Sequence, residues 1–253
     1  TNDGCPGTIT RTWTALDACG NSTSAVQVIS LHELAVTNGL HLQYLFDQPG
    51  LVAVDSSGSG YHGSMTQAFW QPMGSCGGAL QSGQGWVTAG PVLDVGGTRT
   101  SLCVMVRLRS LQGTGEECII GKTRDQLPLN GWSLRLDSYG RAVASLVGDY
   151  PEIASCVSEA SLRDGRWHVI AATFRATQDQ LQTELYVDGE PVSSGSYSGV
   201  HASVASEVPL LVGNLGPGLH APFNGLLDEV RIYGRAPSRE EIATHTTSMS
   251  ACA

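Results

Sequence analysis

Short apolar segments separated by turn-forming residues recur along the whole chain. The sequence has 253 residues, of which 31 are glycine and 11 are proline, and hydrophobic residues make up 41% of it. No apolar segment approaches the ~20 residues that a helix needs to span a bilayer. Short apolar runs bounded by Gly, Pro, Asp and Asn are typical of strands and turns. The sequence therefore predicts an all-β fold.

The charge balance excludes one large class of partners. The formal net charge is -9, and Lys122 is the single lysine in a sequence without any basic run. Nucleic-acid binding depends on Lys and Arg clusters that neutralise phosphates, so we expect no nucleic-acid partner. The hydrophobic content argues against disorder, and a chain of this length buries a full core without metals or disulfides.

The cysteine content favours an extracellular location. Seven cysteines are many for a reduced cytosolic protein, and an odd number leaves at least one thiol free or paired outside the chain. Disulfides are expected among the others, in pairs that the sequence does not reveal. Asn21 begins an Asn-Ser-Thr glycosylation sequon in an expected turn, although such triplets also occur by chance. The chain starts at Thr1 without a signal peptide, so we expect a processed piece of a secreted protein.

Residues 1–33 contain a separate hairpin. Alternation over Thr8–Thr14 and Ala25–Leu31 predicts two strands, and the run from Asp17 to Asn21 has turn chemistry. A lone hairpin is marginal in water, so we expect it to belong to a larger sandwich. The run TITRTWTALDACGN resembles the closing hairpin of HYR-like immunoglobulin-type modules. This resemblance implies that residues 1–33 are the C-terminal hairpin of such an Ig-like module.

The remaining residues, 34–253, predict a larger β domain. Ten or more antiparallel strands in one domain indicate a two-sheet jelly-roll sandwich. A capping box formed by Ser238 and Glu241 predicts one short helix near the end. The expected strands are Leu40–Phe46, Ala79–Ser82, Ser101–Leu108, Cys118–Lys122, Trp132–Asp137, Ala142–Val147, Trp167–Phe174, Gln182–Val187, Pro209–Val212 and Gly225–Tyr233.

Seven motifs in this region resemble the LamG-like, concanavalin A-like jelly roll. In chain order they are LQYLFDQPG, VAVDSSGSGYHGSM, GGALQSGQGWV, DGRWHVIAATF, LYVDGEPV, PLLVGN and FNGLLDEVRIYGRAPSREEI. Ser82 stands where that family commonly has an aromatic residue. The motifs span about four fifths of the chain, and their order carries the resemblance more than any one of them. It implies the concanavalin A-like two-sheet fold.

One aspartate is placed unusually in the expected closing strand. Strict alternation puts Asp228 on the same face as Leu226, Val230 and Ile232. A carboxylate on an apolar face must be paired or must bind a metal ion. The alternative to a metal is that Asp228 accepts backbone N–H bonds or pairs with an arginine.

The family resemblance implies a structural calcium ion. Asp55 begins a glycine-rich turn, and Ca²⁺ takes ~6–8 oxygen ligands that include backbone carbonyls. In the family, the corresponding aspartates commonly share a calcium ion. Carried over to this sequence, the ligands are Asp55 and Asp228, with carbonyl oxygens near Tyr44 or His62. Such an ion would join the N-terminal loop to the closing strand.

The sequence gives no sign of catalysis. Concanavalin A-like glucanases need two carboxylates ~5–9 Å apart, and no strand carries such a set. Gly-x-Ser-x-Gly and Cys-x-x-Cys motifs are both absent from the sequence. His168 follows Trp167 on an expected core strand, which favours a hydrogen-bonded core histidine over a metal ligand. We therefore expect a non-enzyme.

Sugar-binding sites combine aromatic faces with polar groups, often on loops. Tyr150 lies in a turn-rich stretch beside Glu152 and is the first ligand-binding candidate. Trp132 is the second, with core packing as its alternative. The sequence predicts a calcium-stabilised recognition or adhesion module of a large extracellular protein that binds a glycan or protein. The alternative is a structural module of an extracellular fibre or surface array that binds only neighbouring domains.

Overall fold

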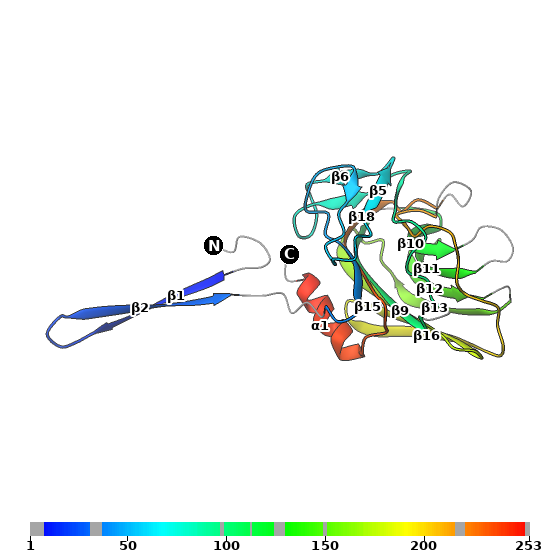
Figure 1. Ribbon diagram of the computed structural model, residues 1–253. Coiled ribbons are helices and arrows are strands. Elements are labelled where there is room, and N and C mark those ends of the chain that lie inside the picture. The colour runs from blue at the N-terminus through cyan, green and yellow to red at the C-terminus, as the bar shows by residue number, and fades with distance from the viewer. Residues whose placement is uncertain are drawn as a thin grey trace.

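The computed structural model describes residues 8–30, 37–96, 99–111, 113–123, 130–148, 151–215 and 221–250. These residues form 18 strands and one helix, α1 (Arg239–Ser250), as Figure 1 shows. No helix in these ranges is long and apolar enough to cross a bilayer.

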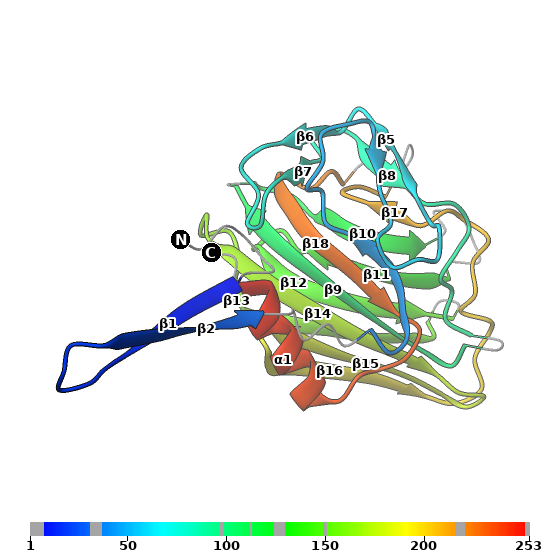
Figure 2. The same ribbon diagram turned by 60° about the vertical axis from the view of Figure 1, so that its left-hand side comes forward.

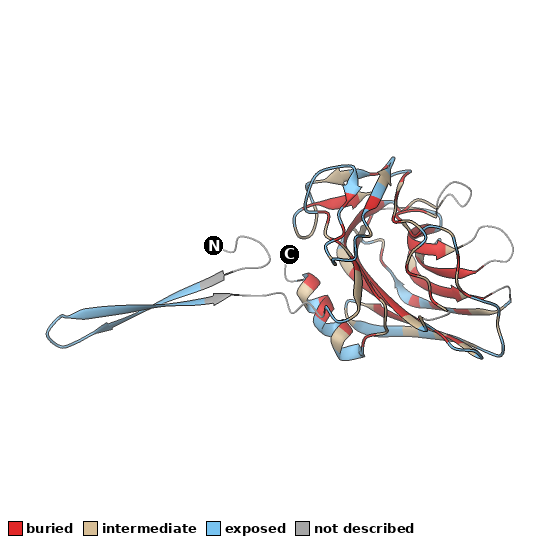
Figure 3. Ribbon diagram, viewed as in Figure 1, coloured by how far each residue is buried: buried red, intermediate tan, exposed pale blue. Residues whose placement is uncertain are grey.

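The N-terminal hairpin stands apart from the sandwich. Strands β1 (Thr8–Leu16) and β2 (Ser22–Ser30) pair over their full length and form a sheet of their own. Every described side chain of this hairpin is exposed, and Trp13 keeps 60% of its surface open (Figure 3). The turn is closed by the Asp17 carboxylate, which accepts bonds from the backbone N–H groups of Cys19 and Asn21. The expected hairpin is confirmed, and its membership in an Ig-like module stays a prediction.

Two antiparallel sheets form the main domain, as expected for a jelly roll. The first contains, in spatial order, β13 (Ile153–Ser161), β12 (Arg141–Val147), β11 (Gly131–Leu136), β10 (Glu117–Thr123), β17 (Leu211–Val212), β8 (Trp86–Thr88), β5 (Gly63–Thr66) and β4 (Val52–Ala53). The second contains β16 (Glu190–Ser198), β15 (Gln180–Val187), β14 (Trp167–Ala176), β9 (Ser101–Ser110), β18 (Gly225–Tyr233), β7 (Ala79–Gln81) and β6 (Phe69–Gln71), with β3 (Leu40–Tyr44) also paired to β18.

The core lies between the two sheets. Trp132 of the first sheet and Phe174 of the second are fully buried, and their ring centroids are 5.5 Å apart. Alternation on β14 sends Ile170 and Phe174 into this core, while Val169 points to the opposite, outer face. The outer face of the second sheet is therefore partly apolar and needs its own cover.

Helix α1 supplies that cover. It packs on the outer face of the second sheet and forms a second apolar cluster, which includes Met105, Val169, Tyr186, Ile242 and Met249 (Figure 2). Its start is the expected capping box. The Ser238 hydroxyl accepts a bond from the Glu241 N–H, and the Glu241 carboxylate accepts one from the Ser238 N–H.

A β-bulge in β18 corrects the expected orientation of Asp228. The pairing of β18 with β9 shifts register between Asp228 and Arg231, and Glu229 has a positive φ of 51°. One extra residue reverses the alternation, so Leu227 and Val230 both enter the core. Asp228 pairs with Arg107 on the outer face, so the prediction that it shares a face with Val230 and Ile232 was wrong.

Candidate functional site

Asp55 closes a turn with its own carboxylate. Its Oδ1 accepts bonds of 2.9 Å from the backbone N–H groups of Gln43 and Ser57, and its Oδ2 accepts one of 2.9 Å from Tyr61. Burial alone would raise the pKa of Asp55, and these donors outweigh burial and lower it. The carboxylate thereby joins β3 to the glycine-rich turn.

Tyr44 and His62 belong to the same network. The Tyr44 hydroxyl donates to the carbonyl oxygen of Tyr61 at 2.5 Å, and the backbone N–H of Asp55 donates to Nδ1 of His62 at 3.0 Å. Burial, followed by the nearby Asp55 charge, raises the pKa of the Tyr44 hydroxyl. The three residues that the family resemblance places in the N-terminal loop are thus close together and hydrogen-bonded.

Asp228 is fully buried beneath the loop that precedes β7. Its Oδ2 accepts bonds from the backbone N–H groups of Ser75 (2.8 Å) and Cys76 (3.2 Å), and its Oδ1 accepts one from Glu229 (2.8 Å). Burial raises the pKa of Asp228 to about 7; the Glu229 charge adds to this, and the backbone donors oppose it. Acceptance of backbone N–H bonds is the alternative to a metal ion that the sequence left open for Asp228.

The four expected metal ligands do not form a side-chain cage. Within the described ranges, no three His, Cys, Asp or Glu side chains are grouped so that they could hold a metal ion. Backbone N–H donors take up oxygen lone pairs of Asp55 and Asp228, and Nδ1 of His62 is also used. A cation bound there would need backbone carbonyl oxygens as ligands. The backbone N–H groups that now donate to the two carboxylates would also have to move away. The calcium site stays a prediction.

The expected ligand-binding residues fall in different environments. Trp132 is completely buried, and its indole N–H donates to the Leu93 carbonyl at 3.1 Å. The prediction that Trp132 binds a ligand was therefore wrong, and its alternative of core packing holds. Tyr150 lies outside the described residues. Asn21 is exposed in the hairpin turn, where its side-chain amide donates to the Asp17 carboxylate.

Cys76 is disulfide-bonded, which fits the expectation of disulfides in this domain. Cys103, Cys118 and Cys156 were also expected to form disulfides, but they carry free thiols, as does Cys19. Burial raises the pKa of the Cys118 thiol to about 12, which leaves it protonated and unreactive at neutral pH.

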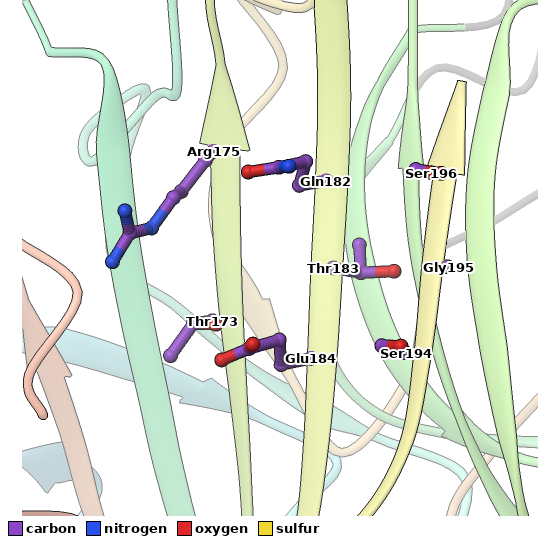
Figure 4. A pocket seen from close by; sticks show the side chains of 8 residues that line it. All are labelled: Thr173, Arg175, Gln182, Thr183, Glu184, Ser194, Gly195 and Ser196. Atoms are coloured by element: carbon purple, nitrogen blue, oxygen red, sulfur yellow. The ribbon is translucent and has the colours of Figure 1, made fainter. Parts of the chain in front are cut away.

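An open polar groove crosses strands β14, β15 and β16 on the outer face of the second sheet. It encloses about 360 Å³. Its lining residues, drawn in Figure 4, are Thr173, Arg175, Gln182, Thr183, Glu184, Ser194, Gly195 and Ser196. We refer to it as the β14–β16 groove.

Strand register orders the groove into two cross-strand rows. Arg175 pairs with Gln182, which pairs with Ser196. Thr173 pairs with Glu184, which pairs with Ser194. Each row places three polar side chains ~4.8 Å apart across neighbouring strands. The groove therefore presents guanidinium, amide, hydroxyl and carboxylate groups at regular intervals.

The charged groups of the groove have different surroundings. Glu184 accepts a hydrogen bond of 2.8 Å from the Tyr186 hydroxyl and lies 3.8 Å from the Arg239 guanidinium at the start of α1. Arg175, which belongs to the other row, is exposed to solvent. Glu184 is the single carboxylate among the lining residues, whereas glycoside hydrolysis requires a pair ~5–9 Å apart. The arrangement suits hydrogen bonding to a polar ligand.

The groove was not predicted because one of its three strands, β16, was not among the expected strands. The segment Glu190–Ser198 is rich in serine and glycine and has no large aliphatic alternation, so it gave no strand signal. The pattern that could have revealed the groove was the alternation of polar residues on the neighbouring strand β15, such as Gln182 and Glu184.

Comparisons with known proteins agree on the fold. A protein-family model described as the concanavalin A-like lectin/glucanases superfamily matches residues 81–243. Domain 4 of AbnA, a GH43 extracellular arabinanase from Geobacillus stearothermophilus, solved with arabinotriose, is 20% identical with a TM-score of 0.60, covering 82% of this chain and 98% of that one. A search of curated proteins found no match.

Two other solved structures are similar over a part of their length. The binding domain of Paraclostridial Mosquitocidal Protein 1 is 15% identical with a TM-score of 0.60, and the match covers 84% of this chain and 52% of that one. A Trypanosoma rangeli sialidase is 18% identical with a TM-score of 0.63, covering 85% of this chain and 33% of the sialidase. The chain thus spans about half of the toxin domain. At these identities the likeness shows the fold alone.

Proposed function

The chain belongs to the concanavalin A-like lectin/glucanase superfamily, and on that premise we propose that it is a non-catalytic glycan-binding module of an extracellular multidomain protein. The similar domain of the arabinanase was solved with arabinotriose, and a similar botulinum neurotoxin binding domain was solved with SialylT. These ligands support a glycan as the partner, with a protein as the second class.

The β14–β16 groove carries the proposal. Its two rows alternate donors and acceptors over three rigid strands, and sugar hydroxyl groups both donate and accept hydrogen bonds. Side chains on paired strands are held in register, so little ordering entropy opposes binding. The single carboxylate of the groove supports a binding role without catalysis.

A glycan array tests the proposal on the full chain. We expect selective binding to one or a few glycans, and a loss of about tenfold or more in affinity when Gln182 and Ser196 are both changed to alanine. Gln178→Ala is the matched control, because Gln178 is an exposed glutamine in the turn after β14. If the double variant binds glycans as tightly as the wild type, the groove is not the binding site. A folded protein that binds no glycan would defeat the function itself.

One observation favours the structural-module alternative. The hairpin of β1 and β2 has open edges and exposed apolar side chains, including Trp13, Val26 and Val28. Such a sheet is marginal alone and gains stability from a neighbouring domain. This supports a place in a multidomain array, whether or not the jelly roll also binds a glycan.

A further inference from the structure

A second set of polar and aromatic side chains is aligned across five strands of the second sheet. The strands are β6, β7, β18, β9 and β14, which lie side by side in Figure 2. Successive residue pairs in their registers connect Phe69, Gln81, Leu226, Arg109 and Trp167. Directly opposed residues share a face, so these five side chains form one row. At ~4.8 Å per strand, the row is about 19 Å long.

The row faces outward, on the side that α1 partly covers. The residues next to it along the strands, Leu80, Leu227 and Leu108, belong to the core between the sheets. Alternation therefore turns the row away from the core. Trp167 is six residues from Thr173 of the β14–β16 groove, or ~20 Å along β14, and the apolar cluster under α1 lies between them. The row and the groove are separate surfaces.

One end of the row offers an exposed aromatic ring beside two amides. Phe69 lies on the edge strand β6 with 60% of its surface exposed. Gln71 is two residues further on the same face, and its Nε2 donates to Oε1 of Gln81 at 2.8 Å. This bond fixes both amide planes beside the ring and leaves the Gln81 amide nitrogen and the Gln71 carbonyl oxygen for a ligand.

The other end pairs an indole with a guanidinium. Trp167 is half-buried, and the Arg107 guanidinium lies 5.9 Å from the centre of its ring, which holds the ring in place. The Nε of Arg109 donates to the Gly165 carbonyl at 2.8 Å, so its planar fork is fixed with the terminal nitrogens free to donate. Between the two ends, Leu226 forms a buried apolar floor.

We propose that this row is an extended binding site for a neutral oligosaccharide, with one sugar ring stacked on Phe69 and a second beside Trp167. The row carries no carboxylate, and its planar polar groups alternate with aromatic and apolar faces. Sugar rings have this same combination, apolar C–H faces edged by hydroxyl groups. The row is about 19 Å long, which exceeds the length of one sugar ring and favours a chain of several sugars. The inference rests on the proposed glycan-binding function and assigns that function a second surface.

The test compares variants of the full chain on an array of neutral oligosaccharides of increasing length. We expect wild-type affinity to rise with chain length, and Phe69→Ala to lower it by about fivefold to tenfold for the longer chains. Phe69→Trp should keep the binding, because it restores an aromatic face. Met73→Ala is the matched control, since Met73 is an exposed apolar residue in the loop after β6.

The outcomes separate the row from the function as a whole. If Phe69→Ala and Arg109→Ala bind like the wild type while the Gln182 and Ser196 double variant does not, the row is overturned and the groove alone is the site. If the folded wild type binds no oligosaccharide of any length, both proposals fail. Because Phe69 is on an exposed edge, its substitution should leave the melting temperature within about 1 °C of the wild type.

Discussion

Nδ1 of His168 lies 2.8 Å from Oδ2 of Asp188, and this contact joins the start of β14 to the turn between β15 and β16. On its other side, Nε2 of His168 lies 3.1 Å from the Asp164 carboxylate. The same Asp188 carboxylate accepts the backbone N–H of Val169. A histidine held between two carboxylates makes this corner of the sandwich sensitive to pH.

The first prediction concerns that sensitivity. The bond to Asp188 raises the pKa of His168; burial opposes this, and Asp164 adds to it. Because the folded pKa lies above the unfolded value of about 6.5, the stabilisation is complete below pH ~6.5 and is lost as the pH rises through the folded pKa. Asp188 and Asp164 are partly exposed, so solvent screening keeps the effect small. We expect His168→Gln to lower the melting temperature by about 2–4 °C at pH ~5.5 and by less at pH ~8.5.

A thermal melt of both proteins across this range checks the prediction. His201→Gln is the control, because His201 bonds to backbone carbonyls rather than to carboxylates. An equal destabilisation by His168→Gln at every pH would show that packing, not charge, is what the histidine contributes.

The second prediction concerns the start of α1. The bond from Arg235 lowers the pKa of Glu241 to about 2, and the Ser238 N–H contributes further. A lowered folded pKa gives stability that is complete above the unfolded value of about 4.3 and is lost as the pH falls through 2. We expect Glu241→Ala to cost about 1–2 kcal/mol of unfolding free energy at pH ~7, and less at pH ~2.5.

Denaturant titration measures this difference. Glu240→Ala is a control in the same helical turn, since Glu240 takes no part in the capping box. A loss from Glu240→Ala as large as that from Glu241→Ala would show that the general charge of the first turn, and not the cap, supports the helix.

The third prediction concerns Trp132. Because its ring is fully buried against Phe174 and its N–H is bonded to Leu93, Trp132→Ala should cost about 3–5 kcal/mol of unfolding free energy. Trp132→Phe keeps most of the volume and should cost less. If Trp132→Ala instead left stability unchanged and removed glycan binding, the ring would be a ligand contact.

The fourth prediction concerns the hairpin. Deleting residues 1–36 should leave the main thermal transition within about 1 °C, because the described side chains of β1 and β2 are exposed and their strands pair only with each other. Calorimetry of the deleted and full chains makes the comparison. A drop of several degrees would mean that the hairpin stabilises the jelly roll directly.

Local patterns predicted the strands that alternate strongly. The strand expected over Trp132–Asp137 is present, and its alternating Leu134 and Leu136 both enter the core. Asp188 and Gly189 both have positive φ, which is typical of an Asp-Gly pair in a hairpin turn. Asp228 was placed on the wrong face because a bulge depends on pairing between strands far apart in the sequence.

The surfaces proposed for binding could not be predicted for the same reason. Phe69 and Trp167 are about 100 residues apart in the sequence, and only the order of five strands aligns them in one row. Likewise, Gln182 on β15 lies opposite Ser196 on β16, and the serines and glycine of β16 give no apolar pattern that would predict a strand. Residue patterns report which side of a strand is buried, and sheet order decides which exposed residues become neighbours.

The last prediction concerns calcium. The family-based hypothesis predicts that about 1 mM Ca²⁺ raises the melting temperature relative to a chelator, and that Asp55→Asn abolishes this rise. Asp55→Asn also loses a charged acceptor for three backbone N–H groups, so it should destabilise the protein by about 1–3 kcal/mol with or without calcium. The calcium-dependent part of the shift is therefore the decisive quantity. The same melting temperature in calcium and in chelator would mean that Asp55 and Asp228 act through their backbone hydrogen bonds alone.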